Sequence, residues 1–373
     1  MRVRGRLATL TPVVALLVAG CGNSVTPPAK ATHSPTPTAS PAPTLLVVAD
    51  PSPYSGQTPT SVRFFKVDGS EVSHVTLAAG DQVVAATGQR VFVLGTNGKL
   101  RALHRDGSFE DLADFGTAGV TFVANPDGTR WLWSTSSSDG NTINSAIHLG
   151  GVGVTPRVIQ SASTSLSEAR EARALRPYEW TAVGAFVEHG AVGIGGYIPY
   201  LAATGPVDQL DVDTGTPTPI ASSTTCGFSD MASDGTVACF PQPRQHTLRL
   251  VRRDGSVVEI PLSTPRFNLT GDAYFSHDGR LLTVAGAVGV GFQGQERYGT
   301  DLVKPVDASI SRISLEGVRP AGFMRAACWL ADGSFVVYRP DNSADGPGVF
   351  IVGPSGASTQ ISKSGVPVGL LTG

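Results

Sequence analysis

The chain has 373 residues, and its 28 lysines and arginines nearly balance its 30 aspartates and glutamates, for a formal net charge of −2. This balance leaves no basic surface for nucleic acid or anionic lipid, so nucleic-acid binding is excluded. The 44 glycines and the scarcity of long helical patterns indicate many short strands joined by tight turns.

The first twenty residues have the pattern of a secretory signal peptide. Three arginines within the first six residues form a charged start, an apolar run follows from Leu7 to Ala19, and small residues lead to Cys21. The apolar run has about 13 residues, whereas a helix that crosses a bilayer needs roughly 20. We therefore expect residues 1–20 to be removed during export.

The end of this signal, Val18-Ala19-Gly20-Cys21, resembles the lipobox of bacterial lipoproteins, with valine in place of the usual leucine. The resemblance implies that Cys21 is diacylated and becomes the mature N-terminus. More than one acyl chain gives stable anchoring. We expect an extracytoplasmic protein that contacts the bacterial cell membrane only through its lipid anchor. The alternative is an ordinary secretory peptide with a chance cysteine.

A stretch rich in proline, threonine, serine and alanine follows at residues 24–43. This composition cannot bury a core, so we expect residues 21–43 to be a lipidated cysteine followed by a disordered tether. As an extended chain it would span roughly 60 Å. The folded domain is then expected at residues 44–373.

From residue 44 onward the sequence repeats a pair of strands around a glycine-bearing turn seven times. The pairs Asp68-Gly69, Asp106-Gly107 and Asp254-Gly255 mark the centres of three such hairpins, because glycine adopts the positive φ that tight turns require. A second set of hairpins has its Asp-Gly pairs at residues 127, 234, 278 and 332. Two hairpins in each unit predict four strands per unit.

Units of four strands at this spacing are typical of a β-propeller. The repeat pattern resembles that of extracytoplasmic seven-bladed propellers with WD40-like or TolB-like repeats, although the Trp-Asp and Gly-His pairs of true WD40 repeats are absent. We expect an all-β fold: a seven-bladed β-propeller of four-stranded antiparallel blades. The expected blades span residues 44–78, 82–115, 119–160, 179–221, 226–262, 270–320 and 322–362.

The first of these blades has only three strands in its own segment. The chain ends in a strand-like piece, residues 366–373, which resembles the inner strand expected at residues 82–88. We infer that the C-terminal strand completes the first blade beside Leu45–Ala49 and closes the ring, which removes exposed sheet edges. The alternative is a frayed tail.

One segment departs from the strand pattern. Ser165-Leu-Ser-Glu168 has the form of a capping box, helix formers follow, and Pro177 is a stop signal. The pattern predicts a short helix over about 165–176, inserted between the third and fourth blades. We expect it to pack on the rim; a partner-binding helix is the alternative.

Three cysteines remain in the expected domain, an odd number for a protein outside the reducing cytosol. Cys226 and Cys239 flank the turn at Asp234-Gly235, although they are not in perfect register about it. We predict a disulfide between Cys226 and Cys239, with Cys328 buried and free.

No cofactor is expected, and one metal site is considered. The segment from Asp341 to Gly346 resembles the first half of a calcium loop, but Val352 stands where an EF-hand has its bidentate glutamate. A solvated loop is favoured; the alternative is a calcium site formed by Asp341, Ser343 and Asp345. Residues 289–294 match a dinucleotide-binding string without the helix that such a site requires.

No catalytic constellation emerges. None of the seven histidines forms a short-spaced metal pair, and no nucleophile elbow is present. The four tryptophans are interpreted as packing residues rather than a ligand cage. We therefore expect a monomeric, non-catalytic module that binds a protein, a peptide or a cell-wall glycan. The alternative is a propeller hydrolase or lyase with an acidic site at the channel mouth.

Overall fold

The computed structural model describes residues 44–50, 59–117, 119–165, 173–191, 203, 205–241, 247–262, 269–288, 297–312, 317–318, 326–339 and 348–372. The chain divides into two compact units, Met1–Pro41 and Ala42–Gly373, and all described residues belong to the second. Among them no helix has the length and apolar character needed to cross a bilayer. The predicted signal peptide, Cys21, the tether and residues 289–294 and 341–345 lie outside the described residues.

The regular structure of the described residues consists of strands and one short 3₁₀ helix, η2 (Ala221–Thr224). The strands are β1 (Leu45–Asp50), β2 (Ser61–Lys66), β3 (Glu71–Thr76), β4 (Gln82–Thr87), β5 (Arg90–Leu94), β6 (Lys99–Leu103), β7 (Phe109–Asp114), β8 (Thr121–Ala124), β9 (Arg130–Ser138), β10 (Thr142–Gly151), β11 (Val154–Ser165), β12 (Arg173–Trp180), β13 (Ala185–Ala191), β14 (Val207–Asp211), β15 (Thr216–Pro219), β16 (Cys226–Met231), β17 (Val237–Pro241), β18 (Thr247–Val251), β19 (Val257–Pro261), β20 (Leu269–Phe275), β21 (Leu282–Val288), β22 (Arg297–Lys304), β23 (Ser309–Arg312), β24 (Gly317–Val318), β25 (Ala326–Trp329), β26 (Phe335–Arg339), β27 (Gly348–Val352), β28 (Ser358–Ser362) and β29 (Val366–Leu371).

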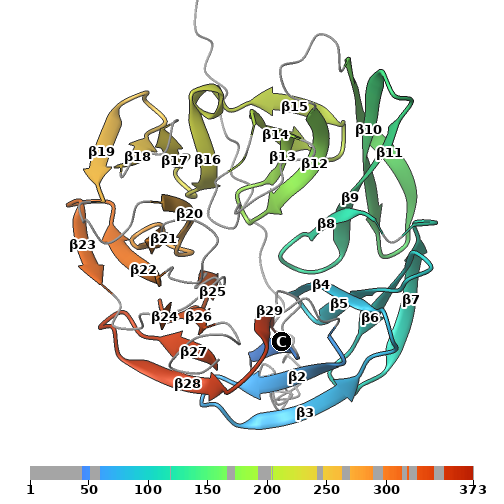
Figure 1. The fold of residues 1–373 in the computed structure, drawn as a ribbon, viewed down its shortest axis with the longest axis horizontal. Helices are drawn as coiled ribbons and strands as arrows, with labels where there is room; N and C mark the ends of the chain where they lie inside the picture. The colour runs from blue at the N-terminus through green and yellow to red at the C-terminus, as the bar shows by residue number, and fades with distance from the viewer. Residues whose placement is uncertain are drawn as a thin grey trace, which may run out of the picture. The chain divides into compact units, whose positions relative to one another are not determined.

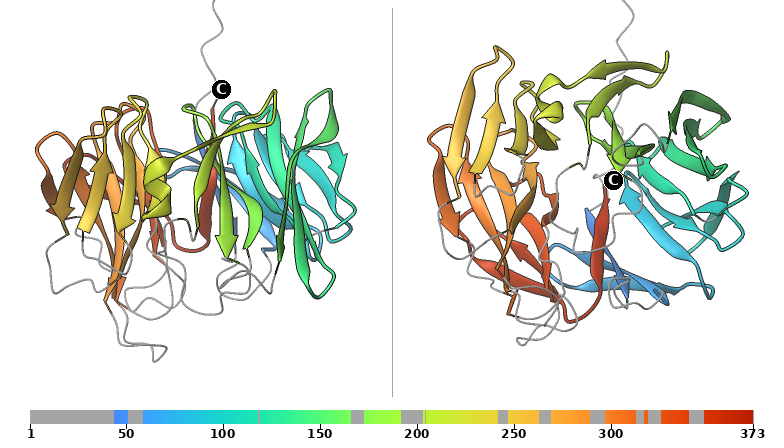
Figure 2. Two further views of the ribbon diagram at one scale, coloured as in Figure 1. Left: turned by 90° about the horizontal axis from the view of Figure 1, so that it is seen from above. Right: turned by 45° about the horizontal axis from the view of Figure 1, so that its top comes forward.

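These strands form sheets that follow one another around a common centre in chain order (Figure 1). Four-stranded sheets run in the orders β11-β10-β9-β8, β12-β13-β14-β15, β16-β17-β18-β19 and β25-β26-β27-β28. The sheet β20-β21-β22-β23 also carries β24 on β22, and an eight-stranded sheet runs β3-β2-β1-β29-β4-β5-β6-β7. Figure 2 shows the strands standing side by side, so the turns collect at two opposite ends.

The predicted Asp-Gly hairpins form turns in which the aspartate side chain binds the backbone. Asp68 Oδ1 accepts the backbone N–H of Ser70 at 2.9 Å and its hydroxyl at 2.6 Å, and Gly69 has a φ of 89°. Asp106 and Ser108 repeat this arrangement with the same distances. The serine hydroxyl and N–H hold the pKa of each aspartate below its ordinary value, so these turns carry fixed negative charges.

Neighbouring sheets share hydrophobic clusters. Leu248 of β18 packs with Val284 of β21, and Phe228 of β16 packs with Phe186 of β13. The last sheet packs on the first strands in the same way, since Val336 and Val349 share a cluster with Leu46 and Phe65. Burial of one such side chain contributes about 1.5–3 kcal/mol. These clusters therefore cover apolar faces of neighbouring sheets.

The C-terminal segment forms β29 between β1 and β4. It pairs antiparallel with β1, with Leu370 opposite Leu46, and meets β4 in parallel at Gly369 and Ala86. Gly369 has a φ of 147°, and a Cβ there would lie 1.9 Å from the Ala86 carbonyl oxygen. Only glycine fits this contact. The C-terminal strand therefore lies beside Leu45–Ala49, the neighbour predicted for it.

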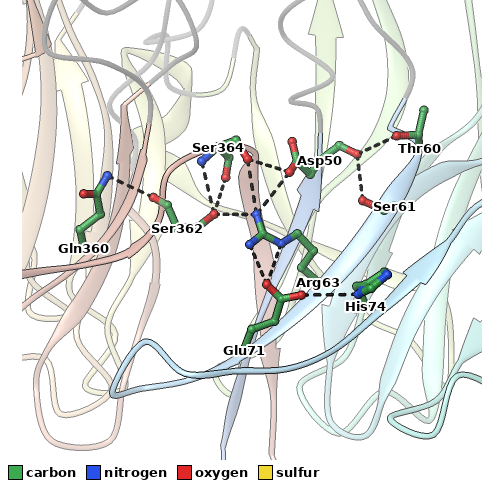
Figure 3. Close-up of polar contacts among 9 residues, drawn as sticks. All are labelled: Asp50, Thr60, Ser61, Arg63, Glu71, His74, Gln360, Ser362 and Ser364. Carbon is green, nitrogen blue, oxygen red and sulfur yellow. Dashed lines mark hydrogen bonds and ion pairs between the residues drawn. The ribbon is translucent and has the colours of Figure 1, made fainter.

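A polar cluster fixes the connection between β28 and β29 to the first strands (Figure 3). Arg63 donates to Glu71 Oε2 at 2.7 Å, to Ser362 Oγ at 3.1 Å and to Asp50 Oδ2 at 3.3 Å. Ser364 Oγ donates to the same Asp50 oxygen at 2.7 Å. One guanidinium thus ties together β1, β2, β3 and the segment that enters β29.

The helix predicted over 165–176 is wrong where the structure describes it. Ser165 ends β11 and Arg173–Arg176 open β12; residues 166–172 lie outside the described residues. Leu175 is buried, and its N–H donates to Ser145 Oγ at 3.0 Å, so tertiary contacts override the local helix propensity. Pro177 lies in β12 beside a register shift, where the missing N–H is tolerated. The fourth unit therefore begins at residue 173 instead of 179.

Deleting residues 366–373 should destabilise the whole domain. The deletion removes the buried side chains of Val366 and Leu371, worth about 1.5–3 kcal/mol each, and leaves unpaired the backbone groups of β1 that bond β29, while those that bond β2 remain paired. A typical domain is stable by only about 5–15 kcal/mol. We expect poor expression or a large fall in the melting temperature.

The matched control for this deletion removes only Thr372 and Gly373, which follow β29. This shorter truncation should melt close to the parent, because the Thr372 N–H contributes one hydrogen bond, to the Gly88 carbonyl. If both truncations melt within about two degrees of the parent, β29 does not hold the domain together.

Candidate functional site

A cavity of about 950 Å³ lies across the hairpin turns of three consecutive sheets, β16–β19, β20–β23 and β25–β28. This volume is in the range of sites that bind small molecules or peptide side chains. We call the cavity the turn groove, and its described lining residues are Ala232, Asp234, Thr236, Leu250, Arg252, Phe275, Ser276, His277, Asp278, Gly279, Arg280, Leu281, Lys304, Pro305, Val306, Leu330, Ala331, Asp332, Gly333 and Pro354.

The floor of the turn groove is apolar. Leu250, Phe275 and Leu330 are buried and Leu281 is half-buried. At the rim, Val306 is 88% exposed, which is the highest exposure of any large hydrophobic side chain in the described part of the chain. Covering this exposed valine and the adjoining apolar floor with a partner would lower the free energy of the complex.

The rim carries three cationic side chains, of Arg252, Arg280 and Lys304, and three carboxylates. The carboxylates already bind their own turns: Asp234 accepts the Thr236 N–H at 2.8 Å and Asp332 accepts the Ser334 N–H at 2.9 Å. These six charges balance formally. The three carboxylates accept hydrogen bonds from backbone N–H groups of their turns, whereas the cationic groups take no part in closing the turns.

The groups that a hydrolase would use are also engaged within the turns. Ser276 Oγ lies 2.8 Å from Asp278 Oδ1 and accepts the Leu281 N–H at 2.9 Å. His277 Nε2 lies 3.1 Å from the Trp329 carbonyl oxygen, which can only accept, so this nitrogen carries a proton and donates. The serine and the histidine of the turn groove therefore stabilise the turns rather than each other.

A buried carboxylate holds the floor in place. Asp230, on β16, accepts the N–H of Phe275 through Oδ2 and of Met231 through Oδ1, both at 2.7 Å. Burial raises the pKa of Asp230 from 3.8 to about 7, although both hydrogen bonds oppose the shift. Ser229 adds a second link, since its Oγ accepts the Ala273 N–H at 2.6 Å. The sheets on two sides of the groove are thereby joined through backbone groups.

The cysteines lie beside these links. Cys226 and Cys239 form a disulfide between β16 and β17 with a Cα–Cα distance of 5.5 Å, and both are buried. A register shift between Phe228 and Asp230 brings the two cysteines close enough in spite of their uneven distance from the turn. Cys328 is free but half-buried, not fully buried as predicted, and burial of its thiol raises its pKa to about 12.

Among the described histidines, His148 packs against an aromatic ring, whereas the others lie against carboxylates or a carbonyl; Trp133 and Trp329 serve in packing. Trp133 is buried between Phe115, at 4.4 Å, and His148, at 4.8 Å between ring centroids. Trp329 is buried and its Nε1 donates to the Tyr274 carbonyl at 3.1 Å. Within the described residues no three histidine, cysteine, aspartate or glutamate side chains gather to hold a metal ion. The calcium candidates Asp341, Ser343 and Asp345 lie outside those residues.

The strands nearest the centre carry mostly apolar half-buried residues. Val83, Val123, Val368 and Leu370 are examples from β4, β8 and β29. The charged Arg176 of β12 is paired with Glu188 at 2.7 Å. The described inner strands thus carry both apolar residues and charged ones, since β12 also holds Arg173 and Glu179 and β16 holds the buried Asp230.

Sequence reasoning missed the turn groove, although one signal was available. Six of the seven Asp-Gly hairpins of the repeat place serine or threonine directly after glycine, at residues 70, 108, 129, 236, 256 and 334. The seventh, Asp278-Gly279, is followed by Arg280. This departure lies in the turn groove.

No protein-family model and no curated protein sequence matches the chain. Several solved structures are similar to it. The acylaminoacyl peptidase of Pyrococcus horikoshii matches with a TM-score of 0.53 at 12% identity, over 87% of this chain and 52% of that chain. This chain therefore spans about half the length of the peptidase.

Two further structures show weaker similarity. TolB from Acinetobacter baumannii has a TM-score of 0.43 at 11% identity, over 84% of this chain and 79% of that chain. The dipeptidyl peptidase 4 of Porphyromonas gingivalis has a TM-score of 0.41 at 12% identity, over 82% and 49%. Identities this low bear on the fold alone. With the four-stranded antiparallel sheets, the peptidase match confirms the predicted all-β, propeller-like fold.

Raising the pH should weaken the contribution of Asp230 to folding. Its folded pKa of about 7 exceeds its ordinary value of 3.8, so between these values the folded protein holds a proton that the unfolded chain releases. The stabilisation is complete below about pH 4 and is lost as the pH rises through 7. Between about pH 5 and 7.5, the free energy of unfolding of the parent should fall by roughly 2 kcal/mol relative to Asp230→Asn.

Urea titrations of the parent and the variant at both pH values measure this difference. Asparagine carries no charge at either pH, so the difference between the two proteins reports the titration of Asp230 together with any group that titrates with it. A difference between the two proteins that stays constant over this range would contradict the raised pKa.

Proposed function

We propose that the chain is a bacterial lipoprotein whose extracytoplasmic, seven-bladed β-propeller binds a peptide, protein or cell-wall glycan in the turn groove without chemical conversion. The single observation that carries the binding role is the groove itself. It combines about 950 Å³ of volume, an apolar floor and charged side chains from three sheets. Convergence of polar groups on an apolar pocket is the usual form of a binding site.

Seven blades follow if the eight-stranded sheet is counted as two, β29-β1-β2-β3 and β4-β5-β6-β7, which meet at the single parallel contact of Gly369. The C-terminal strand then closes the ring. The cluster that joins Val336 and Val349 to Leu46 and the hydrogen bonds of Arg63 to Ser362 support this closure.

The bonded state of Ser276, His277 and the groove carboxylates favours binding over hydrolysis. An activated serine is usually paired with a histidine base; here the Ser276 hydroxyl donates to Asp278 and His277 Nε2 lies against a carbonyl, so these hydrogen bonds do not pair the two residues. The groove therefore offers shape and charge to a ligand. The lipid on Cys21 would hold the domain at the cell membrane while the groove recognises its ligand.

Ala331→Trp tests the binding role. Ala331 is exposed and lines the groove, so an indole there fills the cavity without disturbing the core. The full chain in detergent micelles is offered defined peptide and cell-wall glycan arrays. We expect Ala331→Trp to weaken binding by about tenfold or more, because it removes contact area at the centre of the site.

Ala79→Trp is the matched control, since Ala79 is also exposed and lies outside the groove lining. It should bind as the parent does. Equal binding by parent and Ala331→Trp, or no binding to any array, would contradict the groove as the site. Conversion of an array ligand into products, followed by mass spectrometry, would instead support the hydrolase or lyase alternative.

Cys21→Ala should release the protein from the membrane without unfolding it. The acyl chains are attached only at this cysteine, and the tether separates it from the domain. Fractionation of expressing cells measures the shift from the membrane to the soluble or secreted fraction, and the melting temperature should match that of the parent. Equal membrane retention of the variant would contradict the anchor.

A further inference from the structure

We propose that the turn groove selects peptide segments that carry a carboxylate next to an aliphatic or aromatic side chain. This inference rests on the proposed binding function and specifies its ligand. It follows from three features of the groove: a cation where the hairpin pattern calls for a hydroxyl, two further cations without an ion pair at 4 Å or less, and an apolar surface on which no phenylalanine, tyrosine or tryptophan among the described lining residues is exposed.

Arg280 is the first feature. At the Asp68 and Asp106 turns the residue after glycine is a serine whose hydroxyl bonds the aspartate at 2.6 Å. At Asp278 that role passes to Ser276, whose Oγ lies 2.8 Å from Oδ1, and the side chain of Arg280 is 86% exposed. Its guanidinium lies 3.6 Å from the other carboxylate oxygen of Asp278, so the pair is loose and solvated. The turn closes without needing this cation.

Arg252 and Lys304 are the second feature. Both are exposed, and within the described part of the chain neither forms an ion pair at 4 Å or less. Arg252 directly follows β18 and Lys304 ends β22, so the two cations come from neighbouring sheets, and both line the groove. A ligand carboxylate near them would meet two cations that interact only at longer range with the carboxylates of their own turns, Asp254 and Asp307.

The three carboxylates of the groove compete only weakly with a ligand carboxylate for the cations. Asp234, Asp278 and Asp332 each use Oδ1 to accept a backbone N–H, as do the hairpin aspartates far from the groove. Their presence is explained by turn formation. The N–H donors partly offset their charge, whereas Arg252 and Lys304 interact with the carboxylates of their own turns, Asp254 and Asp307, only at distances beyond 4 Å.

The apolar part of the groove favours a peptide over a glycan. Leu250, Leu281 and Leu330 form the floor. Phe275 is the only phenylalanine, tyrosine or tryptophan among the described lining residues and is only 8% exposed, so the exposed imidazole of His277 is the one aromatic ring on which a sugar could stack. Val306 and its neighbours Pro305 and Pro354 extend the apolar surface to the rim. An aliphatic or aromatic side chain on this surface would place the adjacent carboxylate among the three cations.

The experiment offers the full chain, in detergent micelles, three libraries of N-acetylated, C-amidated peptides. In each library a randomised apolar residue is followed by a fixed aspartate, asparagine or lysine. Retention is measured by equilibrium dialysis and mass spectrometry. We expect the aspartate library to be retained about fivefold better than the asparagine library, with the lysine library weakest, and the preference to shrink at high salt.

Two variants test the cations. Arg280→Ser restores the residue that the other hairpins carry, so the turn should stay folded, and Lys304→Glu reverses a rim charge. Both should bring the ratio of aspartate to asparagine binding close to one. Lys66→Glu is the matched control, because Lys66 occupies the same position at the end of β2, before an equivalent turn outside the groove. It should keep the parent's ratio.

The outcomes separate this inference from the proposed function. Equal retention of the three libraries, with loss of all three in Ala331→Trp, would overturn the acidic preference and leave the groove as a binding site. Binding of glycans but of no peptide library would overturn the peptide class. Retention of the aspartate library that neither Ala331→Trp nor Lys304→Glu changes would place the binding elsewhere and overturn both proposals.

Discussion

The structure depends on one constraint: each four-stranded sheet has two apolar faces and must be covered on both. Clusters such as the one that joins Leu248 to Val284 are made by two sheets, so no sheet is complete without its neighbours. The first and last strands meet the same need through Val336, Leu46 and Phe65. Because the strand residues are required for these packing contacts, the amino acids in the turns at the ends of the sheets can change without loss of the core.

The turn groove follows from this division of roles. Six hairpin turns from three sheets are brought together because the sheets pack in a fixed order, and Asp230 and Ser229 bind the backbone of β20 from β16. The aspartates keep the turns closed through their N–H contacts. Residues beside them, such as Arg280 and Val306, are not needed to close the turns, and their side chains define the chemistry of the surface. Rigid turns with variable neighbours are a common basis for recognition.

Much of the fold could be predicted from the sequence, because glycine after aspartate at regular intervals identifies hairpins directly. The helix predicted after Ser165 shows the limit: its capping pattern is local, whereas the burial of Leu175 and its bond to Ser145 depend on a sheet formed earlier in the chain. The groove could not be predicted for the same reason, since it joins turns that are far apart in sequence. The sequence showed only that Arg280 replaces the usual serine or threonine after glycine. The structure shows that Arg280 and Lys304 line the same groove, which points to a binding role for this replacement.

The central claim is that the ligand lies on the turn groove. Hydrogen exchange of the full chain, measured with and without the tightest-binding peptide of the aspartate library, tests it most directly. Amides at residues 276–281, 304, 306 and 330–333 should exchange more slowly when the peptide is bound, because these turns line the groove and their N–H groups would be shielded from water. Slower exchange confined to turns outside the groove, such as those at Gly69 and Gly107, would contradict the account.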